Sequence, residues 1–120
     1  MLKDSFKYAG QGIKDAFISE RNFRIHCFAT VLVIVFGVFF RLPIYKWVIL
    51  LFAIGFVFVC ELINTAGEVL VDMVTKEYSE EAKKVKDLLA GAVLISAATA
   101  FAAGIFVFID PVIEFITRIF

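Results

Sequence analysis

The sequence predicts an all-α integral membrane protein. Hydrophobic residues make up 62% of its 120 residues, and the mean hydropathy is +0.93, whereas soluble globular domains are about 45–50% apolar. The apolar residues fall into three long segments, each close to the ~20 residues that a helix needs to cross a bilayer. We therefore expect one membrane domain, in which an amphipathic surface helix precedes three transmembrane helices.

The N-terminal segment, residues 1–24, is expected to lie on the membrane surface. Its apolar residues recur at spacings of three and four, with charged residues between them. They are Leu2, Phe6, Ala9, Ile13 and Phe17. A helix with a basic face and aromatic contacts suits the headgroup region of a bilayer. Glu20 follows in a cap-like break, immediately before the first apolar segment.

The three spans are expected at residues 25–42, 47–72 and 88–108. Pro43 interrupts the short connection after the first span and leaves room only for a tight reversal. The third span repeats a small residue at every fourth position, a pattern that lets helix backbones approach closely. The small residues are Ala92, Ser96, Ala100 and Gly104. An amphipathic tail, residues 109–120, follows the third span.

Lysine and arginine residues are divided unequally between the two sides of the expected membrane. Residues 1–24 carry five and the polar loop at residues 73–87 carries four, against three in the rest of the chain. By the positive-inside rule, the N-terminus and this loop lie in the cytoplasm. The net charge is zero, so the balance of charge gives no reason to expect a nucleic-acid partner.

Ionisable side chains form a stripe on the second span. At ~100° per residue on a helix, the stripe contains Glu61, Thr65, Glu68 and Asp72, with Asn64 beside it. A carboxylate at bilayer depth costs about 2.5–3.5 kcal/mol on insertion scales. Interhelical hydrogen bonds would explain one buried glutamate, but three acids on one face repel and need a cation or shared protons. Glu61 is expected just below the membrane surface, and Glu68 and Asp72 at or beyond it.

These residue types suit a metal site at the membrane interface and phosphoryl transfer there. Carboxylate oxygens beside an asparagine suit Mg²⁺, which completes its coordination with water and phosphates. Phosphoryl transfer needs a metal, cations on the phosphates and a carboxylate that takes the proton of the attacking hydroxyl. The chain contains no GxxxxGK[ST] loop, kinase-type glycine loop or catalytic-loop signature, which excludes the soluble-kinase folds.

Three segments resemble the prokaryotic diacylglycerol kinase and undecaprenol kinase family. They are Glu20-Arg21-Asn22-Phe23-Arg24-Ile25-His26, Glu61-Leu62-Ile63-Asn64-Thr65-Ala66-Gly67-Glu68 with Val71-Asp72, and Lys86-Asp87-Leu88-Leu89-Ala90-Gly91-Ala92-Val93-Leu94. The resemblance covers nearly the whole chain in order. It implies a homotrimer of three-span protomers in the bacterial cytoplasmic membrane. Such a protein transfers the γ-phosphate of MgATP to a lipid alcohol at the cytoplasmic face.

The resemblance also implies a role for each matching residue. Glu61 would contact the lipid substrate and act as the general base on its hydroxyl, and Glu20 and Glu68 would hold the metal. The residues implied to bind ATP are Tyr8, Glu20, Asn64, Glu68, Glu77, Tyr78, Lys86 and Asp87. Asp72 also matches the family, and a structural hydrogen bond near the end of the second span explains it equally well.

Two positions depart from the diacylglycerol kinases. His26 stands where those enzymes carry an acidic residue, and the run from Arg21 to His26 is more similar to the Gram-positive undecaprenol kinases, which favours undecaprenol over diacylglycerol as the substrate. Ser79 replaces a histidine in the loop, so the contacts between loop and nucleotide stay open. A histidine satisfied by a backbone carbonyl or a lipid phosphate is the alternative to a catalytic role for His26.

Two other classes of protein stay open on the residues alone. A small oligomeric channel would line its pore with the acidic stripe, but this reading gives no reason for Lys86 and Asp87 or for Glu20. A structural membrane subunit would use the stripe and the small residues to hold helices together. In that case Glu61→Gln would impair assembly rather than activity.

Overall fold

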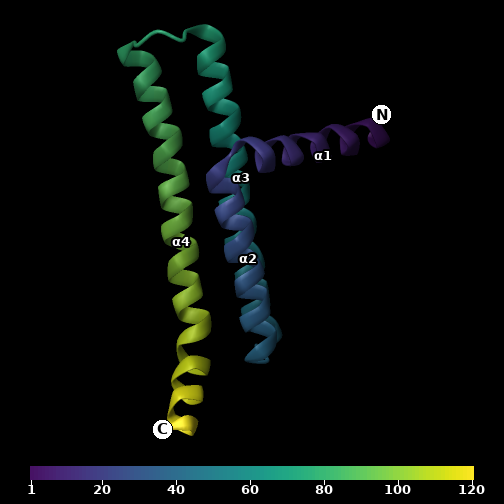
Figure 1. Ribbon diagram of the computed structural model, residues 1–120, viewed down its shortest axis with the longest axis vertical. Coiled ribbons are helices and arrows are strands. Elements are labelled where there is room, and N and C mark those ends of the chain that lie inside the picture. Colours follow the sequence, from purple (N-terminus) through teal and green to yellow (C-terminus); the bar gives the residue numbers. More distant parts are fainter.

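The computed structural model describes all 120 residues, which form four helices and no strand. The helices are α1 (Leu2–Ser19), α2 (Arg21–Phe39), α3 (Ile44–Val74) and α4 (Glu80–Ile119). Figure 1 shows α3 and α4 side by side, α2 overlapping the lower part of α3, and α1 projecting sideways from a point partway along the bundle. Contacts join α2 to α3 and α3 to α4. α1 contacts α2 and α3 but not α4. The prediction of an all-helical chain is confirmed.

Three of the helices, α2, α3 and α4, are long and apolar enough to cross a membrane, as the sequence predicts. The 19 residues of α2 span about 28 Å, close to the ~30 Å of a hydrocarbon core. The 31 residues of α3 and the 40 residues of α4 span about 46 Å and 60 Å. The ends of α3 and α4 therefore reach beyond any membrane that α2 just crosses.

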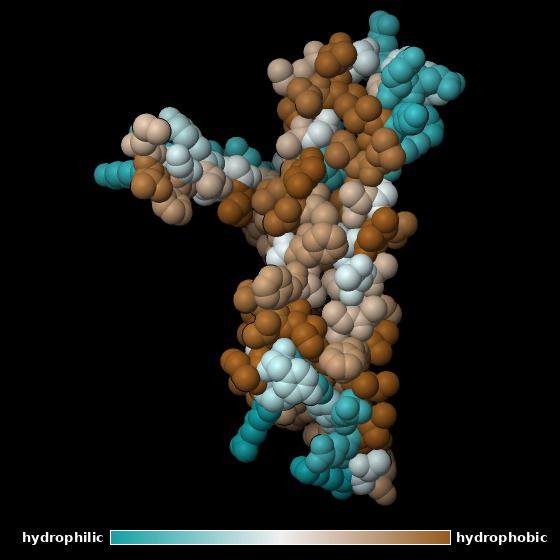
Figure 2. Space-filling model, turned by 180° about the vertical axis from the view of Figure 1, so that it is seen from behind, coloured by the Kyte–Doolittle hydropathy of each residue, from teal (hydrophilic) through white to brown (hydrophobic).

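The surface of the bundle is largely apolar. Figure 2 shows hydrophobic side chains over the middle of the three long helices and hydrophilic ones gathered at the two ends and on α1. Only 10 of the 120 residues are buried, and the hydrophobic core consists of Leu42, Leu50 and Val107 with partly buried neighbours. Exposed apolar surface of this extent requires lipid or other protein chains to cover it.

The connection between α2 and α3 is as tight as Pro43 predicts. Arg41 has a φ of 54°, in the left-handed region that often ends a helix. Its N–H donates to Val38 O, and the N–H of Leu42 donates to Gly37 O, both at 3.1 Å. This pattern is a Schellman motif. A side chain at Gly37 would collide with the ring of Trp47, which lies 2.6 Å from the position of a Cβ, so the glycine lets the two helices close on each other.

The loop between α3 and α4 is shorter than the predicted residues 73–87. α3 continues to Val74 and α4 begins at Glu80, so only five residues connect them. The side chain of Ser79 caps α4 by accepting a hydrogen bond from the N–H of Ala82 at 3.0 Å. Glu80 and Glu81 lie in the first turn, where negative charge is favourable. The polar residues from Glu80 onward are therefore helical.

The predicted tail is not a separate element, because α4 continues through Pro111 to its end at Ile119. Proline has no N–H, so the carbonyl of Val107, four residues earlier, loses its helical donor. Lys46 of α3 replaces that donor: its Nζ donates to Val107 O at 2.9 Å. Lys46 is only 6% exposed. A hydrogen bond between two helices thus compensates for the proline.

We expect the energetic cost of losing this hydrogen bond to depend on Pro111. Lys46→Met should lower the free energy of unfolding by about 1–3 kcal/mol, because a buried carbonyl oxygen is left without a donor. In a Pro111→Ala background residue 111 supplies the donor again, and Lys46→Met should cost less. Unfolding of the four variants in detergent micelles measures this double-mutant cycle. Equal costs in the two backgrounds would show that Lys46 does not compensate for Pro111.

Candidate active site

The polar stripe on α3 runs from the apolar middle of the bundle toward the loop. Glu61 is buried, with 3% of its surface exposed. Asn64 and Glu68 are half-buried, and Asp72 is exposed. The carboxylate that the sequence places deepest in the membrane is therefore also the one most enclosed by protein. The other members of the stripe become more accessible toward the loop.

Glu61 contacts His26 of α2. Nε2 of His26 lies 3.1 Å from Oε1 of Glu61, and 24% of the histidine side chain is exposed. The ring of His26 also lies edge-on to Phe58, with 6.5 Å between centroids. The sequence suggested a backbone carbonyl or a lipid phosphate as the partner of His26, and the structure shows a carboxylate instead. No local motif signals this pairing, because it depends on how α2 and α3 are aligned.

Asn64 and Glu68 form the next pair along α3. Nδ2 of Asn64 donates to Oε1 of Glu68 at 3.4 Å, while Oδ1 of Asn64 is buried without a hydrogen-bond partner. Leaving a buried acceptor unsatisfied costs about 1–3 kcal/mol, and an ion or a water is a common explanation for such a group. This amide oxygen and the adjacent carboxylate are oxygen donors of the kind that Mg²⁺ takes, so the residues present fit that metal.

Glu20, the other predicted metal ligand, lies at the junction of α1 and α2 and is half-buried. Its backbone is extended, and its carboxylate makes no capping hydrogen bond to α2. Nowhere in the chain do three His, Cys, Asp or Glu side chains gather as a metal site. A metal here would therefore take few protein ligands, which is the usual arrangement for Mg²⁺ with phosphates and water.

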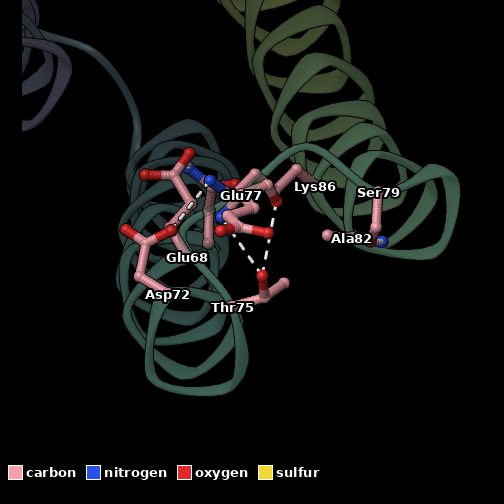
Figure 3. Close-up of polar contacts among 8 residues, drawn as sticks. Glu68, Asp72, Thr75, Glu77, Ser79, Ala82 and Lys86 are labelled. Carbon is pink, nitrogen blue, oxygen red and sulfur yellow. Dashed lines mark hydrogen bonds and ion pairs between the residues drawn. The ribbon is translucent and has the colours of Figure 1, made fainter.

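Lys86 and Asp87, the predicted nucleotide-binding pair, each have another partner. Nζ of Lys86 lies 3.0 Å from Oδ1 of Asp72 and joins α4 to α3 (Figure 3). Asp87 pairs with Lys83 at 2.6 Å, one turn earlier on α4. The side chains of Lys86 and Asp72 are 43% and 50% exposed, and such pairs contribute only about 0–1 kcal/mol. Lys86 can therefore exchange this partner for another anion. The bond also gives Asp72 a partner on α4.

The remaining predicted residues lie apart from the stripe. Glu77 and Tyr78 are exposed in the loop, where the N–H of Glu77 donates to Oγ1 of Thr75 at 3.1 Å (Figure 3). Tyr8 is 70% exposed on α1. Because α1 does not contact α4, one protomer does not bring Tyr8 together with Lys86. The predicted ATP-binding residues thus do not form one pocket within a single chain.

An apolar groove of about 700 Å³ lies between α2, α3 and α4, and 16 of its 19 lining residues are hydrophobic. His26 is the only ionisable residue in the lining. Glu61 does not line the groove, but it is hydrogen-bonded to His26, which does. The histidine therefore stands between the hydrophobic groove and the buried carboxylate.

Three helices that are long and apolar enough to cross a membrane define a small membrane protein. Its acidic stripe runs along α3 toward the loop. Residues 7–108 match the sequence model of the family described as Prokaryotic diacylglycerol kinase. The undecaprenol kinase of Bacillus subtilis is 39% identical over 105 residues, which cover 88% of this chain and 85% of that protein. The diacylglycerol kinase of Synechocystis is 40% identical over 111 residues, which cover 92% of this chain and 63% of that protein.

A further relative is the diacylglycerol kinase of Escherichia coli K12, 32% identical over 89 residues, which cover 74% of this chain and 73% of that protein. The chain therefore belongs to the prokaryotic diacylglycerol kinase family. The resemblance noted in the sequence is confirmed. As a member of this family the chain is a lipid kinase, which sets aside the channel and structural-subunit alternatives.

The pairing of Asp72 with Lys86 can be tested for its strength. Asp72→Asn, Lys86→Gln and the double variant should each change the free energy of unfolding by less than about 1 kcal/mol, because both side chains are well solvated. Thermal or denaturant unfolding in micelles, analysed as a double-mutant cycle, measures the coupling. A coupling well above 1 kcal/mol would mean that Lys86 is held too firmly to exchange partners.

Proposed function

We propose that this chain transfers the γ-phosphate of MgATP to the hydroxyl of a membrane lipid alcohol. The observation that carries the proposal is the buried carboxylate of Glu61. It begins a stripe that continues along α3 to the oxygens of Asn64 and Glu68 and to Asp72, the partner of Lys86. Undecaprenol is the favoured acceptor, supported by the 39% identity to an undecaprenol kinase of similar length and by His26. Diacylglycerol is the alternative, supported by the relatives that carry that name.

In this proposal Glu61 is the general base. It accepts the proton of the lipid hydroxyl as the hydroxyl oxygen forms a bond to the γ-phosphorus, while the bond from that phosphorus to the bridging oxygen breaks and ADP leaves. Phosphoryl transfer depends mainly on positioning and charge stabilisation. Glu61 suits this role because its α3 position is shielded from water, at the level where a lipid alcohol in the membrane presents its hydroxyl.

Glu20 and Glu68 would hold Mg²⁺ in this proposal, and Asn64 would help to position the phosphates. The buried, unpartnered Oδ1 of Asn64 supports this assignment, as does the absence of any capping bond from Glu20. When bound, the metal would neutralise charge on the β- and γ-phosphate oxygens.

Lys86 would exchange Asp72 for a phosphate of the nucleotide. Asp87, Glu77, Tyr78 and Tyr8 would surround the rest of ATP. Charge-assisted bonds to phosphate are stronger than a solvated surface pair, and this difference favours the exchange. The exposed position of the loop residues leaves them free to contact a nucleotide from the water side.

We also propose that the chain is a homotrimer in the bacterial cytoplasmic membrane. The small number of buried residues, 10 of 120, supports an oligomer, because neighbouring protomers would cover apolar surface that one chain exposes. The lysine and arginine count supports a cytoplasmic N-terminus, loop and active site. α1 would lie on the membrane surface, and its exposed Leu2, Phe6 and Phe17 would contact lipid.

The activity is tested by following labelled γ-phosphate from MgATP into extractable lipid, with undecaprenol and diacylglycerol in parallel. The wild-type protein should label undecaprenol more than diacylglycerol. Glu61→Gln, which keeps the size of the side chain and removes its basicity, should lower the rate by at least ~100-fold, in the range typical of a lost general base.

Circular dichroism and size-exclusion profiles of Glu61→Gln serve as the folding control. Label in neither lipid, from folded wild-type protein supplied with Mg²⁺, would refute the proposed reaction. Label only in diacylglycerol would keep the kinase and correct the substrate. Full activity of Glu61→Gln would remove Glu61 from the role of base.

Mixed oligomers test whether neighbouring protomers complete the site. Glu20→Gln and Glu61→Gln should each be inactive alone. If the site combines residues of two chains, mixing the variants before reconstitution should restore a substantial fraction of the activity, because some sites then receive both intact residues. Activity restored in mixtures, together with a mass of three chains by light scattering, supports a shared site in a trimer. Mixtures that stay inactive would place both residues of a site in one chain.

A further inference from the structure

Glu61 makes one side-chain hydrogen bond, and its partner is His26. Oε1 of Glu61 and Nε2 of His26 are 3.1 Å apart, and the carboxylate is almost completely removed from solvent. A buried carboxylate needs a hydrogen-bonding partner. The bond connects two helices, α2 and α3, that are 35 residues apart at this point of the sequence.

The ring of His26 is held in place by its surroundings. Phe58 lies edge-on to it, and Phe58 in turn contacts Phe23 with 5.1 Å between the ring centroids. Phe23 is 5% exposed. The backbone around His26 is regular α2 helix. The backbone carbonyl of His26 accepts a hydrogen bond from Oγ1 of Thr30 at 2.7 Å. An imidazole ring held in this way can hold Oε1 of Glu61, its hydrogen-bond partner, in one place.

The rotation of a glutamate carboxyl group about its last bond is only weakly restricted. A hydrogen bond from a fixed ring to Oε1 removes this freedom and leaves Oε2 with a defined direction. Catalytic groups depend on such precision, since a misplacement of about 1 Å can cost ~100-fold in rate. His26 also lines the apolar groove, so its bond to Glu61 lies beside that groove.

We propose that His26 is a positioning residue for the phosphoryl transfer: it holds Oε1 of Glu61, and Oε2 then receives the proton of the lipid hydroxyl. This inference rests on the proposed function, in which Glu61 is the base. His26 itself touches neither nucleotide nor the reacting atoms. It acts on the rate through Glu61, and therefore its removal lowers kcat rather than the affinity for MgATP.

Two substitutions at His26 separate this role from simple helix packing. The amide nitrogen of glutamine reaches about as far from the backbone as Nε2 of histidine, whereas that of asparagine reaches only about as far as Nδ1. His26→Gln should keep kcat within several-fold of the wild type. His26→Asn should lower kcat by ~10- to 100-fold, with KM for MgATP changed by less than about 2-fold. Cys27→Ala, at the next position on α2, is the control and should leave kcat unchanged.

The chain contains a single histidine, which permits a test that does not alter His26. NMR spectra of protein with labelled histidine report this ring alone. Glu61→Gln should shift the ring nitrogen signals if the two side chains are bonded, whereas Asp72→Asn, about three turns further along α3, should not. Unchanged signals in Glu61→Gln would overturn the proposal even if the His26 variants do not fold.

The kinetic outcomes are equally decisive. Wild-type protein that phosphorylates lipid, together with equal kcat values for His26→Asn and His26→Gln, would overturn the positioning role and leave the proposed function intact. A rise in KM for MgATP at unchanged kcat would also overturn it. Wild-type protein that phosphorylates neither lipid would overturn both proposals.

Discussion

Polar groups inside an apolar bundle need partners within the bundle, and two such partnerships join the helices. The donor for Val107 O comes from Lys46 across the α3–α4 contact, and the partner of Glu61 comes from α2. Ser96, fully buried in the small-residue line of α4, donates to the carbonyl of Val93. The Ser96 bond stays within α4, whereas the other two connect helices. Hydrocarbon contacts alone permit helices to slide, and each polar pair between helices fixes one register.

The need to satisfy buried polar groups also changes along the stripe on α3, because the stripe is buried at Glu61 and exposed at Asp72. At the buried end of the stripe a carboxylate is tolerated only when it is hydrogen-bonded. Glu61, the proposed base, lies there and is bonded to His26. Toward the loop, solvent stabilises charge, and the exposed pair of Asp72 and Lys86 can open. A single continuous helix therefore gives a dry end suited to proton transfer from a lipid and a wet end suited to a nucleotide.

Hydrophobic periodicity and length were sufficient to predict the three long helices and the acidic stripe, because both depend on local sequence. The short motifs were sufficient to identify the family. Three features could not be predicted. The contact of His26 with Glu61 depends on the alignment that the Arg41 turn imposes, the loop is shortened by the Ser79 cap, and the continuity of α4 through Pro111 depends on a lysine 65 positions earlier in the sequence.

The bond between Lys46 and Val107 restricts the order in which Lys46 and Pro111 can be replaced during evolution. A carbonyl oxygen has two lone pairs, so a chain that loses Pro111 first regains the helical N–H and keeps the lysine bond beside it. A chain that loses Lys46 first leaves the oxygen bare. A lineage that loses both residues is therefore expected to lose Pro111 before Lys46. Sequences that retain the proline without the lysine should be rare.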